Sequence, residues 1–158
     1  MYDDPLAYFL TWTTYGTWLP GDDRWWVQPG QGHQPPNPSK RRYVASLMTE
    51  PPLTLSPGQR ELVEQIIRKH CQIRIWELHA VNCRTNHVHV VVTADVAPKA
   101  VAQQFKAWCT RCLKEQQVSS GTLNSSTREN WWTEGESRHQ LFDTESLQAA
   151  IVYVLEGQ

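Results

Sequence analysis

The sequence lacks the long hydrophobic run that a membrane-spanning helix requires. Its 158 residues contain no apolar stretch that reaches the roughly 18 residues at which a helix becomes a candidate span. Acidic Asp3 and Asp4 lie near the N-terminus, where a secretory signal carries basic residues. We therefore expect no contact with a membrane and a location in the cytoplasm.

An excess of positive charge and a dense set of cysteines are also missing. The net charge is -1 and the isoelectric point is about 6.6, which argues against a protein that binds polyanions over its whole surface. Any contact with nucleic acid must then be local. Four cysteines are too few to indicate a disulfide framework, so we expect reduced thiols.

The length fits one domain over residues 1–158, with a single hydrophobic core. Residues 20–52 are rich in Gly, Pro, Asp and Gln and show no sustained periodicity, which predicts a long loop. Loops of this length are usually functional or disordered. A loop that grips a ligand and a floppy insertion are both open at this point.

Residue patterns elsewhere predict four strands and three helices. The strands are expected over residues 8–15, 73–83, 86–92 and 138–142, and the helices begin at Pro57, at Pro98 and after Asp143, with a polar loop over residues 117–130. This order predicts an α+β fold. We expect an antiparallel sheet with helices on one face, close to a ferredoxin-like sandwich.

Two histidines stand out within the third predicted strand. Side chains alternate along a strand, so His87 and His89 point to the same face, while Val88, Val90 and Val92 point to the other face. Two imidazoles on one face are typical of a metal site. A pair of hydrogen-bonded histidines on a half-exposed strand is the simpler alternative.

Tyr153 lies away from the apolar stripe of the last predicted helix. At about 100° per residue, it falls roughly 120° from the stripe through Leu147 and Val154. It is either a partly exposed tyrosine or a nucleophile. A phenol, with an ordinary pKa of about 10, needs an electrophile polarised by a metal, and the paired histidines would hold such a metal.

The run His87-Val88-His89, followed by a helical tyrosine in Ala150-Ile151-Val152-Tyr153, resembles the single-tyrosine HUH transposases. The similarity is greatest to the IS200-like branch that includes the REP-associated tyrosine transposases, and the aromatic segment at residues 8–19 is similar to their first strand. The resemblance implies a ferredoxin-like domain with a C-terminal catalytic helix. It also implies that the histidines hold a divalent cation, Mg²⁺ or Mn²⁺, and that Tyr153 nicks single-stranded DNA. The nick would leave a 5′-phosphotyrosine link and a free 3′-hydroxyl that permits rejoining during transposition.

The third metal ligand is left open by the resemblance. Family members commonly place a glutamine or similar residue one turn after the tyrosine, where this chain has Gly157. Glu156 and Gln158 are therefore both candidate ligands. The family also has Met-Pro-Asn before the first histidine, whereas this chain has Arg84-Thr85-Asn86 and keeps only the Asn.

Aromatic and basic residues supply a hypothesis for DNA binding. Tryptophans stack on unpaired bases and cations meet phosphates. The candidates are Trp25, Trp26, Trp131 and Trp132 for bases, and Lys40, Arg41, Arg42, Lys106 and Arg111 for phosphates. Core packing is an equal alternative for each tryptophan.

Two other functions compete with a nicking enzyme. The histidine-triad nucleotide hydrolases have a third histidine where this chain has Val91. A non-catalytic module, domesticated or truncated, would bind single-stranded or hairpin DNA without using Tyr153. The sequence does not decide between a monomer and a homodimer.

Overall fold

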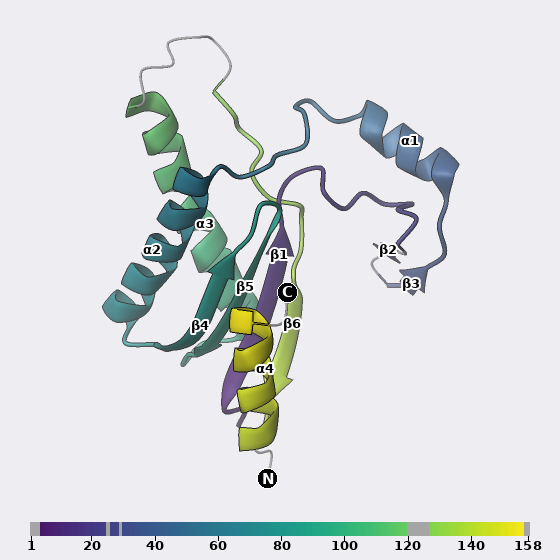
Figure 1. The fold of residues 1–158 in the computed structure, drawn as a ribbon. Coiled ribbons are helices and arrows are strands. Elements are labelled where there is room, and N and C mark those ends of the chain that lie inside the picture. Colours follow the sequence, from purple (N-terminus) through teal and green to yellow (C-terminus); the bar gives the residue numbers. More distant parts are fainter. Residues whose placement is uncertain (1–3, 25, 29, 120–126, 157–158) are drawn as a thin grey trace.

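A four-stranded antiparallel sheet forms the centre of the molecule (Figure 1). A computed structural model describes residues 4–24, 26–28, 30–119 and 127–156. The strands are β1 (Ala7–Thr13), β4 (Glu77–Cys83), β5 (His87–Thr93) and β6 (Ser137–Leu141), and they lie in the order β4-β5-β1-β6. The first strand in the chain is therefore in the interior of the sheet, between β5 and β6.

Helices α2 (Pro57–Arg74) and α3 (Pro98–Ser119) cover one face of this sheet. Ser56 begins α2 with a capping box to Gln59, as the sequence predicts. The alternate side chains of β5 meet the apolar stripes of both helices. The resulting core is fully buried at Leu10, Val63, Ile67, Val88, Val90, Val92, Val101 and Phe105.

Helix α4 (Thr144–Glu156) packs on the opposite face of the sheet, beside β4 and β5. Its contact is small, because Val154 is its only residue classed as buried in the described part of the helix. Val154 meets Ala7, Ala80 and Val91 in a second cluster. The α+β fold with an antiparallel sheet is confirmed, with α2 and α3 on one face and the C-terminal helix on the other.

The prediction that residues 20–52 are a long loop is wrong in its secondary structure. The segment contains a hairpin of β2 (Trp26–Gln28) and β3 (Gly32–Gln34), followed by α1 (Pro38–Ser46). Asn37 caps α1 and Pro38 begins it, a local signal that the turn-rich composition obscured. The described residues of 20–48 form an arm that projects from the sheet and its helices (Figure 1).

Two predicted boundaries differ most from the structure. Helix α2 continues to Arg74, so the strand predicted from residue 73 begins only at Glu77. Ile75 stops the helix in a left-handed conformation, with φ of 59°, which its β-branched side chain gave no reason to expect. Helix α3 extends to Ser119, into the segment predicted as a loop from residue 117. Within the described residues, no helix is both long and apolar enough to cross a membrane.

Replacement of Phe105 tests the principal core. Its ring is fully buried and packs against Trp12 and Trp76, so Phe105→Ala should lower the free energy of unfolding by about 3–5 kcal/mol. Urea denaturation measures this change. Phe142→Ala, at a half-exposed ring, serves as the control. Equal effects of the two substitutions would contradict the assignment of the core.

Candidate active site

His87 and His89 project from the face of β5 that lies under α4. Their ring centroids are 4.7 Å apart. The branched Val88, between them in sequence, is buried on the opposite face. The alternation predicted from the sequence therefore brings the two imidazoles together.

Each imidazole has a hydrogen-bond partner at Nδ1. The Nδ1 of His87 lies 2.8 Å from the side-chain oxygen of Asn86, which only accepts, so this Nδ1 is the donor. In the neutral ring, metal ligation is then assigned to Nε2. The Nδ1 of His89 lies 2.7 Å from the hydroxyl of Thr11 on β1. These bonds at Nδ1 fix the orientation of both rings.

Tyr153 lies beside the histidines, although it comes from a different element. Its ring centroid is 5.6 Å from that of His89, in an edge-on arrangement. The residue is 48% exposed, so the side chain lies at the surface and not in the core. The structure thus unites the three residues that sequence reasoning singled out for chemistry.

Phe9 is a member of this cluster that sequence reasoning missed. Its ring stacks on His89 at 5.7 Å and meets the edge of Tyr153 at 5.9 Å. His139 on β6 lies on the other side of Phe9, at 6.2 Å between ring centroids. The pattern of β1 placed Phe9 in a strand, but only the pairing of β1 with β5 and β6 shows which rings it touches.

Asn82 attaches α4 to the sheet next to the cluster. It is paired with His89 in the register of β4 and β5. Its side-chain amide donates a 2.9 Å hydrogen bond to the carbonyl of Val154, the residue after Tyr153. Carbonyl groups in the last turn of a helix have no partner within the helix. This bond therefore fixes the end of α4 relative to the histidines.

The residues fit a divalent cation as two of its ligands. Two oriented imidazoles on one strand face supply nitrogen donors, and Mg²⁺ and Mn²⁺ keep waters or phosphate oxygens at their other positions. In the described part of the chain, no group of three His, Cys, Asp or Glu residues is arranged to hold a metal. Glu156 stays a predicted ligand, and Gln158 lies outside the described residues.

The tryptophans predicted to stack on bases have structural roles where the structure describes them. Trp131 is buried at 2% exposure in the principal core, so its ring has no face open to a base. Trp132 packs edge-on against Trp12 and donates to the hydroxyl of Thr110. Trp26 is also buried and donates to the carbonyl of Pro35. Trp25 lies outside the described residues.

The predicted phosphate ligands divide into two groups. Lys106 is largely buried, bonds to the carbonyl of Gly135 and pairs with Glu136 at 3.5 Å. Burial lowers the pKa of this lysine. Its contacts make it a structural cation rather than a surface ligand for phosphate. Arg111 lies on α3, over the ring of Trp108, and α3 covers the sheet face opposite the histidines.

The three basic residues of α1 lie on the arm. Lys40 is placed over the ring of Trp26, 4.4 Å from its centroid. Arg41 and Arg42 are exposed on the arm. The cluster predicted from the sequence is therefore on a helix, separate from the sheet that carries the histidines.

Loss of the Asn82 amide should loosen the end of α4. Asn82→Ala removes one hydrogen bond worth about 1 kcal/mol, so amide exchange in the last turns of α4 should rise about fivefold. Hydrogen–deuterium exchange with mass spectrometry measures this rate. Peptides from α2 provide the internal control, and unchanged exchange in α4 would show that Asn82 does not hold it.

Comparison with known proteins gives matches in sequence and in fold. The family model described as "Transposase IS200 like" matches residues 54–151, more than half of the chain. The match includes both histidines and ends two residues before Tyr153. No curated protein matches the sequence.

Among solved structures, the fold is similar to that of a REP-associated tyrosine transposase bound to a REP hairpin, with a TM-score of 0.56 and 14% identity. The similarity covers 98% of this chain and 67% of the other. A transposase-like protein from Deinococcus radiodurans R1 gives a TM-score of 0.44 at 18% identity, over 99% of this chain and 93% of the other. The family match over residues 54–151 decides the assignment: the chain belongs to the IS200-like transposase family.

Proposed function

We propose that this transposase nicks and rejoins single-stranded DNA through Tyr153, with a divalent cation held at His87 and His89. One observation carries the proposal. The tyrosine of α4 lies against the histidine pair of β5, with 5.6 Å between the ring centroids of Tyr153 and His89. A half-exposed nucleophile and a pair of ligands able to hold the metal that activates its target are thus adjacent, with His89 itself buried at 6% exposure.

Tyr153 carries the chemical step. Its phenolic oxygen attacks the phosphorus of a backbone phosphodiester, and the bond between phosphorus and the 3′ oxygen breaks. The phenol loses its proton and the departing 3′ oxygen gains one. The products are a 5′-phosphotyrosine link and a free 3′-hydroxyl. Attack on that link by a 3′-hydroxyl reverses the step and rejoins a strand, so the energy of the phosphodiester is retained.

The surrounding residues orient the reacting groups. Asn86 and Thr11 hold the two imidazoles by their Nδ1 atoms. Phe9 and Asn82 hold the tyrosine ring and the helix that carries it. When bound, Mg²⁺ or Mn²⁺ supplies polarisation of the phosphate oxygens and offsets the charge that develops on them. Such fixed positions lower the entropic part of the barrier.

The DNA partner is supported by the family and by the structural neighbour. That neighbour, a REP-associated tyrosine transposase, is bound to a REP hairpin. We therefore propose a single strand, alone or beside a hairpin, as the substrate of this chain. A cytoplasmic location and a homodimer stay predictions.

A covalent adduct tests the nicking reaction. Wild type and Tyr153→Phe are incubated with labelled single strands from the flanks of the gene, with and without hairpins, in Mg²⁺ or Mn²⁺. Denaturing electrophoresis should show an adduct with wild type alone, and excess chelator should abolish it, because phenylalanine has no nucleophilic oxygen. Tyr43→Phe, at an exposed tyrosine of α1, is the matched control and should react as wild type does.

The same experiment distinguishes the alternative function. If DNA strands bind equally well to wild type and to Tyr153→Phe, and no adduct forms with either cation, the chain is a non-catalytic DNA-binding module and not an enzyme.

Removal of one imidazole tests the metal site directly. His87→Ala should weaken Mn²⁺ binding at least about tenfold, because it deletes one of two fixed nitrogen ligands. Isothermal titration calorimetry without DNA measures the affinity. His79→Ala is the control, since His79 is a neighbouring strand histidine that bonds to the hydroxyl of Thr93. Equal affinity in the two variants would place the metal elsewhere.

A further inference from the structure

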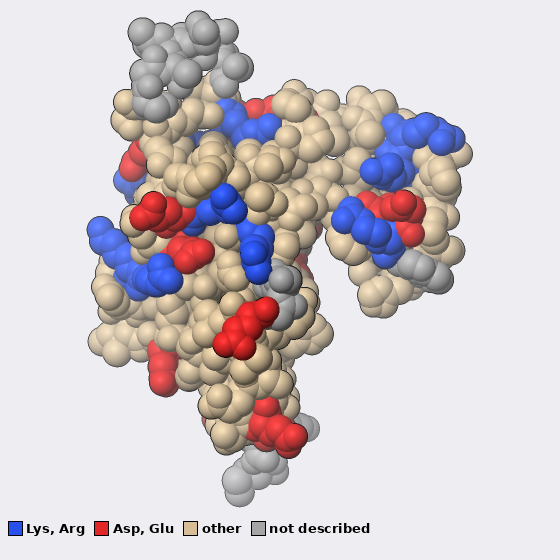
Figure 2. All heavy atoms as spheres, in the orientation of Figure 1, with Lys and Arg blue, Asp and Glu red and all other residues tan. Residues whose placement is uncertain are grey.

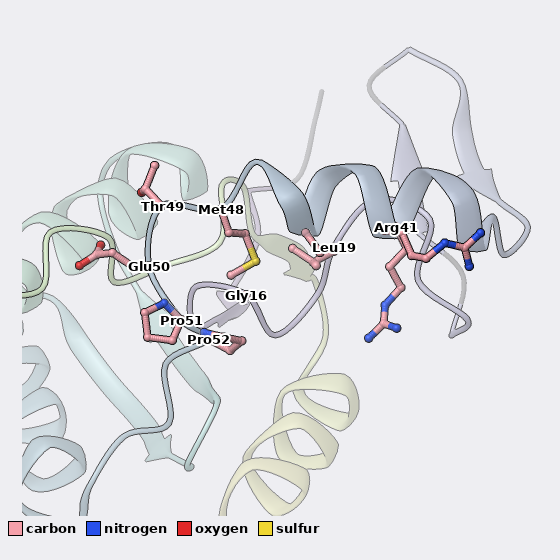
Figure 3. Close-up of a pocket in the computed structure, with 10 residues that line it drawn as sticks. Gly16, Leu19, Arg41, Met48, Thr49, Glu50, Pro51 and Pro52 are labelled. Atoms are coloured by element: carbon pink, nitrogen blue, oxygen red, sulfur yellow. The ribbon is translucent and has the colours of Figure 1, made fainter.

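A hollow of about 560 Å³ lies between α1 and the segments that enter and leave the arm, residues 14–19 and 48–53, which we call the base of the arm (Figure 3). Its volume is within the range of small-ligand sites in proteins. The lining residues are Gly16, Leu19, Arg41, Arg42, Ala45, Met48, Thr49, Glu50, Pro51 and Pro52. The hollow is separate from the histidine and tyrosine cluster, and nothing in the reaction described above uses it.

Two adjacent arginines give the hollow its positive charge. Arg41 and Arg42 are exposed, and within the described residues neither forms an ion pair with a carboxylate. Guanidinium groups bind phosphate with two parallel hydrogen bonds, which makes Arg the preferred residue for phosphate recognition.

The single carboxylate among the lining residues is already engaged. Glu50 accepts hydrogen bonds from the backbone amides of Glu129 and Asn130 and from the side chain of Asn130. Figure 3 shows the Glu50 carboxylate directed away from Arg41. The Glu50 carboxylate is therefore hydrogen-bonded to residues 129 and 130, and it does not neutralise the arginines. Figure 2 shows basic residues on the arm together with acidic ones, and Asp22 in this segment is paired with Arg24.

An apolar surface completes the lining. Leu19, Met48 and the two prolines at residues 51 and 52 provide it. The wall is closely packed, because a Cβ on Gly16 would come within 2.8 Å of the Cα of Pro52. Apolar side chains beside exposed arginines match the two parts of a nucleotide, its base and its phosphate.

The hollow lies on the continuation of the strand that supports the histidines. Thr13 at the end of β1 is paired with His87, and Gly16 follows three residues later. The backbone of Thr14 bonds to Asn86, and that of Leu53 bonds to Tyr15. The base of the arm is therefore hydrogen-bonded to the end of the sheet that carries the histidines.

We propose that this hollow receives one unpaired nucleotide of the DNA strand, with its phosphate on Arg41 and Arg42 and its base against the apolar wall. The inference rests on the proposed function, because it takes the same single strand as its ligand. A nucleotide held here selects and orients the strand at a second point away from the histidine and tyrosine cluster.

Two kinds of variant test the two halves of the site. Arg41→Ala with Arg42→Ala removes the phosphate ligands, and Ala45→Phe fills the hollow without a change of charge. Both act on α1, where no residue is buried, so the core should be unaffected. Circular dichroism and thermal unfolding verify this. The matched controls are Arg68→Ala on α2, an exposed arginine, and Ala107→Phe on α3, an exposed alanine.

The assay is fluorescence anisotropy with a labelled single strand from the flank of the gene. Every protein also carries Tyr153→Phe, so binding is measured without covalent capture. The double arginine variant and Ala45→Phe should each weaken binding at least about tenfold, and the two controls should stay within about twofold of the parent. A series of strands with one abasic position each should identify a base whose loss weakens the parent but not Ala45→Phe.

Three results would overturn the inference. Unchanged affinity in both variants would show that the hollow takes no part in binding. A loss confined to the arginine variant would mean contact with phosphate on the surface of α1 and an empty hollow. An abasic series with no sensitive position would exclude a bound base. Since adduct formation by the wild type is measured separately, each of these results leaves the proposed nicking reaction standing.

Discussion

The antiparallel pairing of β1 with β5 is the constraint on which the rest of the structure depends. It places Thr11 opposite His89 and Thr13 opposite His87, so the strand that begins the fold also supports the histidines. The same pairing puts the alternate side chains of both strands into the core under α2 and α3. A shift of one residue would move the histidines into that core and the valines to the surface. The hydrophobic pattern therefore fixes the register and the site together.

Helix α4 is bound far less tightly than the strands beneath it. It contributes one buried residue, Val154, while Leu155 and Val152 are about half exposed. The contacts that define the position of Tyr153 are the rings of Phe9 and His89 and the hydrogen bond from Asn82. A reactive side chain on a lightly packed helix is held by a few specific contacts, so those contacts set its geometry.

The sequence was sufficient where a local pattern determines the outcome. Alternation along β5 placed His87 and His89 on one face, and helical spacing placed Tyr153 off the apolar stripe. It was insufficient where partners come from distant segments. The neighbours Phe9 and Asn82 depend on strand pairing, and the burial of Trp131 depends on how its segment returns to the core. Residues 20–52 were misjudged because turn-forming residues outweighed the short capping signal at Asn37 and Pro38. Lys106 is a basic residue in sequence and a largely buried structural cation in the fold.

The central claim is that the phenolic oxygen of Tyr153 is the nucleophile that forms a covalent bond to a DNA phosphate. The most direct measurement is tandem mass spectrometry of the protein after incubation with a single strand and Mn²⁺, followed by nuclease and protease digestion. The account predicts a nucleotide mass attached to the peptide that contains Tyr153, at the tyrosine oxygen. A nucleotide attached to Tyr8, Tyr15 or Tyr43 instead would contradict it. So would an unmodified Tyr153 peptide in a reaction in which the DNA strand has been cut.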